Sequence, residues 1–157
     1  MAFSIIYGDI TKVQADAIVN AANERLLMGG GVCGAIFRAA GCSDLTKACQ
    51  HIGRCPTGEA VITPAFQLPA QYIIHTVGPV WNGGSHKERQ LLYQCYANSL
   101  SLAASYGLRS IAFPLISSGI FGYPRDEALQ VCQEAISDFL ASHDMDVYLV
   151  LLPSHTH

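Results

Sequence analysis

The chain has 157 residues, of which 50% are apolar and 13% are charged, a composition suited to one domain with a sizeable core. Its net charge of -3, with no block of Lys or Arg, argues against nucleic-acid binding driven by the phosphate backbone. No apolar run reaches the roughly 18 residues of a membrane span, and the N-terminus lacks the layout of a signal peptide. Six scattered cysteines without a CxxC pair indicate reduced, buried thiols, so a cytoplasmic protein with no membrane partner is expected.

Strand and helix patterns alternate along the chain. Two short strands are predicted over residues 4–7 and 17–20, followed by helices over residues 32–40 and 43–52, the second capped by Ser43 or Asp44. Two strands over residues 60–63 and 72–77, a helix over 87–106, a strand over 110–116, a helix over 125–142 and a strand over 147–152 complete the pattern. Such alternation predicts a three-layer α/β/α arrangement in a single domain, residues 1–157.

The first glycine loop, residues 22–30, runs from the second strand towards the first helix and ends in Gly29 and Gly30, with Gly31 next. Glycines let backbone N–H groups approach a ligand closely, and a helix N-terminus adds unpaired donors and a positive dipole end. Asn20 and Asn23 can add uncharged hydrogen bonds to a sugar or an amide. This combination is typical of a phosphate or nucleotide site.

The second glycine loop, residues 117–124, follows the strand predicted over 110–116 and contains Ser117, Ser118, Gly119 and Gly122. Alone it is better explained by an ordinary turn. Together with the first glycine loop it predicts a cleft that holds a diphosphate from both sides. Asp9, after the first strand, is either an acceptor for the exocyclic amine of adenine or a turn and cap carboxylate.

Five motifs in one order resemble those of the macrodomains, a family that binds ADP-ribose, and in particular its MacroD-type branch. They are Gly8-Asp9-Ile10-Thr11, Val19-Asn20-Ala21-Ala22-Asn23, Gly29-Gly30-Gly31-Val32, Ile74-His75-Thr76-Val77-Gly78-Pro79 and Ser118-Gly119-Ile120-Phe121-Gly122-Tyr123-Pro124. The resemblance implies a mixed, mostly parallel central sheet, and the C-terminal segment of this sequence is short compared with the family pattern. It implies hydrolysis of mono-ADP-ribose from acidic side chains of proteins, deacetylation of O-acetyl-ADP-ribose, or both. ADP-ribose, ADP-ribosylated proteins and O-acetyl-ADP-ribose are the expected partners of a monomer that needs no cofactor or metal.

The resemblance also implies a role for individual residues. Asp9 and Ile10 would hold the adenine, and Asn23 would bind the distal ribose and act in catalysis, while Asn20 braces the loop. The distal ribose and diphosphate would contact a set drawn from both glycine loops and the helix start: Gly30, Gly31, Val32, Ser118, Gly119, Ile120, Phe121 and Gly122.

The sequence departs from the family pattern at three places. Cys33 stands where MacroD-type enzymes have an aspartate that helps to activate water, so Cys33 is the second candidate catalytic residue and the rival interpretation is a non-catalytic ADP-ribose reader. Phe121 replaces a tyrosine, and Leu152 or Pro153 stands where an aromatic residue stacks on adenine. A zinc site is disfavoured because the spacing of Cys42, Cys49, His51 and Cys55 matches no common structural zinc site.

Overall fold

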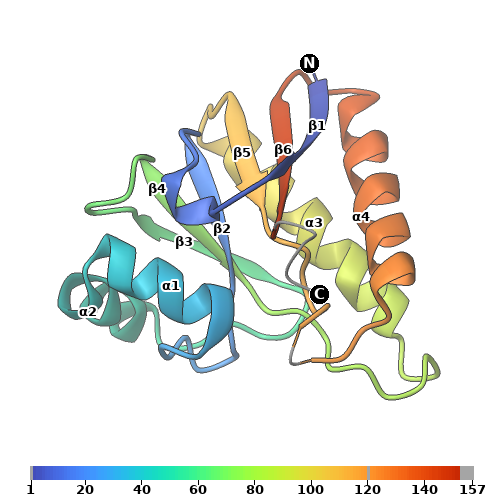
Figure 1. Cartoon of the computed structure of the whole chain (residues 1–157), viewed down its shortest axis with the longest axis horizontal. Helices are drawn as coiled ribbons and strands as arrows, with labels where there is room; N and C mark the ends of the chain where they lie inside the picture. Colours follow the sequence, from blue (N-terminus) through green and yellow to red (C-terminus); the bar gives the residue numbers. More distant parts are fainter. Residues whose placement is uncertain (1, 120, 153–157) are drawn as a thin grey trace.

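The computed structural model describes residues 2–119 and 121–152, and it contains one six-stranded sheet (Figure 1). The strands lie in the order β1-β6-β5-β2-β4-β3, and every neighbouring pair is parallel except β3 and β4, which are antiparallel. The sequence-based expectation of a mixed, mostly parallel sheet is therefore confirmed. The strands are β1 (Ala2–Tyr7), β2 (Ala17–Ala21), β3 (Ala60–Pro64), β4 (Tyr72–Thr76), β5 (Ser110–Phe113) and β6 (Asp146–Leu151).

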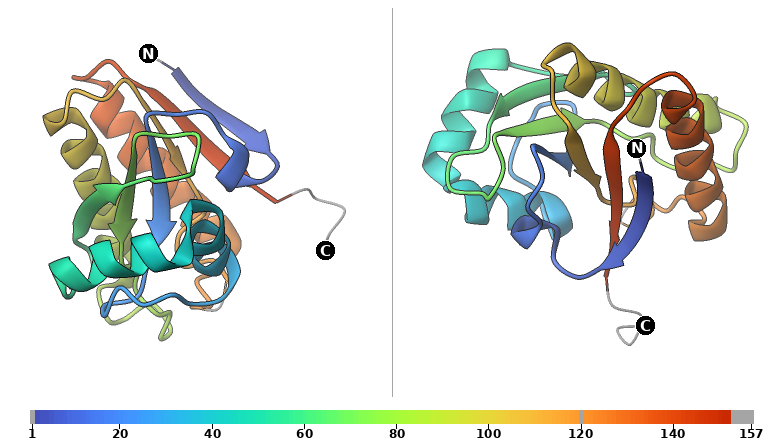
Figure 2. Two further views of the ribbon diagram at one scale, coloured as in Figure 1. Left: turned by 90° about the vertical axis from the view of Figure 1, so that its left-hand side faces the viewer. Right: turned by 90° about the horizontal axis from the view of Figure 1, so that it is seen from above.

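Helices cover both faces of the sheet, which confirms the three-layer arrangement. On one face lie α1 and α2, and on the other lie α3 and α4 (Figures 1 and 2). A short 3-10 helix, η1, follows β1. The bounds are η1 (Ile10–Lys12), α1 (Gly31–Ala40), α2 (Cys42–Ile52), α3 (Glu88–Ser105) and α4 (Arg125–Leu140).

Each central strand is buried on both faces because its alternate side chains enter two different cores. In β2, Ala17 and Val19 belong to the core beneath α3 and α4, while Ile18 belongs to the core beneath α1 and α2. All three are fully buried. This explains why the strand reads as a continuous apolar run rather than as an alternating one.

Most element boundaries shift by one or two residues from those predicted by the sequence, and two of the differences have a clear physical cause. The strand predicted over residues 110–116 ends at Phe113, because Pro114 has no N–H to donate to a neighbouring strand. Ser43 and Asp44 do not cap α2, whose N-cap is Gly41 at φ 111°. Gly41 serves both helices at once: its N–H donates to Phe37 of α1 over 3.0 Å, and its carbonyl accepts from Leu45 of α2 over 3.1 Å. A single left-handed glycine thus replaces the expected side-chain cap.

The predicted burial of the cysteines holds for five of the six. All six are free thiols, and Cys42 is exposed because it begins α2. Within the described residues, no three His, Cys, Asp or Glu side chains come together as a metal site would require. No helix in that part of the chain is long and apolar enough to cross a membrane.

Candidate ligand-binding site

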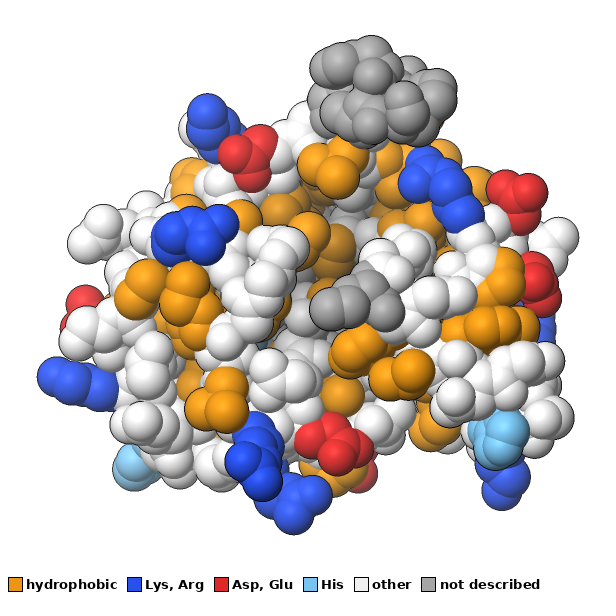
Figure 3. Space-filling model, turned by 60° about the horizontal axis from the view of Figure 1, so that its bottom comes forward, with side chains coloured by type: hydrophobic (Ala, Val, Ile, Leu, Met, Phe, Trp, Pro, Cys, Tyr) orange, Lys and Arg blue, Asp and Glu red, His pale blue; other side chains and the backbone are white. Residues whose placement is uncertain are grey.

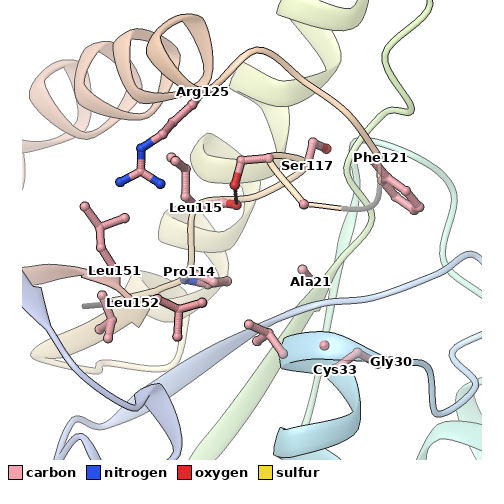
Figure 4. A pocket seen from close by; sticks show the side chains of 15 residues that line it. Ala21, Gly30, Cys33, Pro114, Leu115, Ser117, Phe121, Arg125, Leu151 and Leu152 are labelled. Carbon is pink, nitrogen blue, oxygen red and sulfur yellow. Dashed lines mark hydrogen bonds between the residues drawn. The ribbon is translucent and has the colours of Figure 1, made fainter. Parts of the chain in front are cut away.

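A cavity of about 390 Å³ opens at the carboxyl ends of three adjacent parallel strands, β2, β5 and β6. Open α/β sheets place their ligands at this edge, and the volume is in the range of small-molecule sites. Figure 3 shows the hollowed face, with hydrophobic side chains around the hollow. The two glycine loops supply opposite walls, as Figure 4 shows, and the lining residues are Ala21, Gly30, Gly31, Val32, Cys33, Pro114, Leu115, Ser117, Ser118, Gly119, Phe121, Arg125, Val150, Leu151 and Leu152.

The first wall is the start of α1. Gly30 is the N-cap, and the first helical hydrogen bond runs from the Gly34 N–H to the Gly30 carbonyl over 3.2 Å. The N–H groups of Gly31, Val32 and Cys33 therefore have no acceptor within the helix, and they lie at its positive end. Such a helix start is suited to bind an anionic group.

Close backbone packing fixes this wall in place. A Cβ at Gly34 would lie 2.5 Å from the carbonyl oxygen of Gly29, so only glycine permits α1 to approach the loop that precedes it. The contact is with backbone, which cannot rotate away. Gly34, three residues beyond the glycine run, therefore lets the helix touch the loop that precedes it.

The second wall is a compact turn after β5. Gly122 N–H donates to Gly119 over 2.9 Å, and Tyr123 N–H donates to Ser117 over 2.9 Å. Ser117 has the positive φ of 66°, uncommon for a residue with a side chain. A Cβ at Gly78 would overlap the hydroxyl of Ser117, so the segment after β4 supports this turn from behind.

Cys33 lies at the junction of the cavity with a buried polar chain. It lines the cavity and is 7% exposed, and Asn20 Nδ2 lies 3.7 Å from its sulfur. The same Nδ2 lies 3.0 Å from Nδ1 of His75, and Nε2 of His75 lies 3.0 Å from the hydroxyl of Thr63. Burial lowers the pKa of His75 to about 4, so its ring is neutral at pH 7. His75 is therefore a buried core residue, and the contacts of Asn20 are consistent with the prediction that it braces the loop.

Of the predicted binding residues, Gly30, Gly31, Val32, Ser118, Gly119 and Phe121 line the cavity, as does the candidate catalytic Cys33. Gly122 lies in the same turn without lining the cavity. Ile120 lies outside the described residues.

Asn23 does not line the cavity, because its side chain closes the first glycine loop. Its Nδ2 donates to the Leu27 carbonyl over 2.8 Å, and its Oδ1 accepts from the Leu27 N–H over 3.0 Å. Both polar atoms of the amide are thus engaged by the loop. A ligand contact from Asn23 would have to use the remaining hydrogen-bonding capacity of the amide.

Asp9 and Ile10 also lie outside the cavity lining. Asp9 caps η1, with its Oδ1 accepting from the hydroxyl of Thr11 over 2.7 Å and from the Thr11 N–H over 2.9 Å. These bonds lower the pKa of the Asp9 carboxyl. Ile10 is 6% exposed and packs in the core beneath α1. The structure thus shows Asp9 as a cap carboxylate, which was one of its two interpretations. The other, a contact with adenine, stays a prediction, since the exposed carboxylate can accept further hydrogen bonds.

At the far end of the cavity, sequence reasoning named Leu152 but missed Arg125 and Leu151. Figure 4 shows Arg125 projecting from α4 towards Leu151 and Leu152, at the end opposite Phe121. Leu152 is 68% exposed, and Arg125 is the one cationic side chain among the lining residues. The signal was present, since Arg125 follows the second glycine loop directly and Leu152 ends the last predicted strand.

Comparisons with known proteins agree on one family. A family model described as "Macro domain" matches residues 19–132. An O-acetyl-ADP-ribose deacetylase of Escherichia fergusonii is 52% identical over 152 residues, covering 93% of this chain and 85% of the relative. A solved macrodomain of Oceanobacillus iheyensis with ADP has a TM-score of 0.92 and 47% identity, covering 96% of this chain and 83% of that one. A Trypanosoma brucei macrodomain in complex with ADP-ribose has a TM-score of 0.86 and 43% identity, covering 94% and 63%.

Proposed function

This chain belongs to the macrodomain family, and we propose from that premise that it binds ADP-ribose and hydrolyses an ester at the distal ribose. The substrates are O-acetyl-ADP-ribose, proteins carrying mono-ADP-ribose on acidic side chains, or both. In each case water cleaves an ester, and ADP-ribose and a carboxylate are the products. The observation that carries the proposal is the convergence of both glycine loops on one cavity at the ends of β2, β5 and β6.

The diphosphate lies, in this proposal, between the N-terminus of α1 and the second glycine loop. The unpaired N–H groups of Gly31, Val32 and Cys33 supply fixed donors for it, and Arg125 adds a positive charge at the cavity. Adenine lies towards Leu151 and Leu152, within reach of Asp9 and Ile10. The distal ribose lies towards Phe121, Gly30 and Asn23.

Catalysis in this arrangement comes from positioning and from backbone donors that are already oriented before the substrate arrives. The water is held by a phosphate oxygen of the ligand and by Asn23, near Cys33. No side-chain base is required at position 33 for this step, although a carboxylate there would strengthen it. We also propose that the chain acts as a monomeric single domain in the cytoplasm.

A non-catalytic reader is the second candidate function, and Cys33 is the observation that favours it. The Cys33 thiol lies 3.7 Å from the carbonyl oxygen of Leu27. A thiol is only a weak hydrogen-bond donor, and it stands where MacroD-type enzymes have a carboxylate. Turnover of O-acetyl-ADP-ribose and of a mono-ADP-ribosylated protein distinguishes the two functions. Binding without any turnover would establish the reader.

Calorimetry tests the binding itself. We expect a dissociation constant for ADP-ribose in the low-micromolar range or weaker, about -8 kcal/mol or less favourable. AMP and ATP are the comparison ligands, because neither carries a distal ribose. If all three bound equally, the assignment of the distal ribose to Asn23 and Gly30 would be wrong.

A further inference from the structure

The tryptophan loop, residues 80–87, connects β4 to α3 and lies against the second glycine loop, where both leave the same end of the sheet (Figures 1 and 2). The Trp81 N–H donates to the carbonyl of Phe121 over 2.8 Å. The Trp81 ring packs on Tyr123, with centroids 4.7 Å apart. Because Phe121 lines the cavity, this hydrogen bond joins the tryptophan loop directly to a residue of the ligand site.

Glu88, the first residue of α3, holds the tryptophan loop from inside. Its side chain is 1% exposed, and its carboxylate accepts three backbone N–H bonds from that loop. Oε2 accepts from Asn82 over 2.8 Å and from Gly84 over 3.1 Å, while Oε1 accepts from His86 over 2.6 Å. Among the described residues, Glu88 is the one buried carboxylic acid.

The ionised form of Glu88 is the one that fits this position. Burial by itself would raise the pKa of the carboxyl, but the backbone donors outweigh it and lower the pKa to about 2. An anion that accepts several N–H bonds makes stronger hydrogen bonds than a neutral acceptor does. The tryptophan loop is neither helix nor strand, and hydrogen bonds to the Glu88 carboxylate hold its backbone in place instead.

The tryptophan loop is also folded tightly onto the indole. Gly84 has φ 91°, and a Cβ there would lie 2.9 Å from Cη2 of Trp81. Lys87, just before Glu88, has φ 64°. The tryptophan loop therefore has little freedom to move without displacing Trp81, which donates to the cavity-lining turn.

We infer that Glu88 is a positioning residue for the ligand site: its carboxylate orders the tryptophan loop, which holds Phe121 and the second glycine loop in their binding geometry through Trp81. Glu88 itself does not line the cavity. The inference rests on the proposed function, since it assigns the second glycine loop to ADP-ribose. It adds a determinant of affinity that lies behind the binding surface.

Substitution Glu88→Gln tests this inference, because glutamine keeps the size but turns one acceptor oxygen into a donor that faces backbone N–H groups. We expect the dissociation constant for ADP-ribose to rise about tenfold, measured by calorimetry well below the unfolding temperature. Trp81 is the only tryptophan of the chain, so its emission reports directly on the tryptophan loop. Acrylamide should quench it more strongly in Glu88→Gln, and bound ADP-ribose should reduce that quenching.

Glu134→Gln is the matched control, since it makes the same change at an exposed carboxylate that pairs with Arg89 over 2.5 Å. Its affinity and its Trp81 quenching should equal those of the wild type. Gly84→Ala is a second variant that disturbs Trp81 without touching Glu88, and it should also weaken binding. Glu88→Asp, which keeps the charge, should restore part of the affinity.

The outcomes separate this inference from the proposed function. If the wild type binds ADP-ribose and folded Glu88→Gln and Gly84→Ala bind it equally well, the positioning role is wrong and the proposed function stands. Loss of stability in these variants with unchanged affinity of the folded protein would also overturn the positioning role. If the wild type does not bind ADP-ribose, the proposed function itself fails.

Discussion

The side chains of Asn20 and His75 meet across paired positions of β2 and β4, with Nδ2 of Asn20 3.0 Å from Nδ1 of His75. With the amide donating, Nδ1 is the acceptor and Nε2 carries the hydrogen, which points to the hydroxyl of Thr63. Thr63 in turn donates to the carbonyl of Pro64 over 3.1 Å. The neutral form of His75 is thus built into the sheet immediately behind Cys33.

The stability of the protein should fall in mild acid because of His75. Its pKa is about 4 in the folded state and 6.5 as the ordinary value, so between these limits the unfolded chain binds a proton that the folded chain does not. Stability is unaffected above pH 6.5 and is lost as the pH falls from 6.5 to 4, by about 3 kcal/mol in all. Denaturant unfolding should show that the free energy of unfolding decreases as the pH falls through this range, and His75→Gln should remove this decrease.

His143→Gln is the control for this experiment, because His143 is exposed and its substitution should leave the slope in place. A flat stability profile from pH 6.5 to 4 in the wild type would contradict the burial of a neutral His75.

Glu88 adds a separate loss of stability at lower pH. Its folded pKa of about 2 lies below the ordinary 4.5, so its contribution is present above pH 4.5 and disappears as the pH falls towards 2.

Cys33→Asp should raise the rate of hydrolysis. Asn20 Nδ2, 3.7 Å from the sulfur, is placed to donate to a carboxylate at this position, and the N-terminus of α1 favours negative charge. We expect turnover to increase about tenfold or more, a fraction of the range known for a general base. Cys33→Ala is the matched control and should stay near the wild-type rate. Equal rates for Cys33→Asp and Cys33→Ala would show that position 33 does not take part.

Asn23→Ala should reduce turnover by about a hundredfold, because the first glycine loop loses both bonds with Leu27 and the site loses its proposed contact with water and ribose. Stability should fall by about 1–2 kcal/mol. Asn98→Ala removes a comparable bond, to the carbonyl of Gly58 over 2.7 Å, away from the cavity. It should cost similar stability and keep full turnover. Full turnover in Asn23→Ala would refute its assignment as a catalytic residue.

Alkylation of the cysteines should follow their surroundings. Cys42 is exposed and should react first, and Cys33, which lines the cavity, should react next. Burial raises the pKa of Cys49, Cys55 and Cys95 to about 11 and that of Cys132 to about 12, so these four should be nearly inert.

Brief iodoacetamide treatment and peptide mapping, with and without ADP-ribose, measure this order. ADP-ribose should protect Cys33, which lines the cavity, and should leave Cys42 as reactive as before. Equal reactivity of Cys33 and Cys132, or a Cys33 that ADP-ribose fails to protect, would remove Cys33 from the binding site.

The sequence by itself determined the layers, the two glycine loops and the part of the cavity lining that these loops and the helix start supply, because these depend on local patterns. Apolar runs define buried strands, and glycines that follow a strand and precede a helix define a loop at the carboxyl edge. Nine ligand-binding residues are predicted in the two loops and the helix start. Six of them line the cavity: Gly30, Gly31, Val32, Ser118, Gly119 and Phe121.

Only the tertiary structure decided which hydrogen-bond partner each polar side chain has. No residue pattern shows that Glu88 turns back to three N–H groups or that Asn20 meets His75. Asn23, an evident ligand contact in the sequence, is engaged by Leu27 in the structure. The contact of Asn20 with His75 depends on how strands distant in sequence pair, and the bonds of Glu88 and Asn23 depend on the conformation of irregular loops. Residue patterns within one helix or strand carry no record of either.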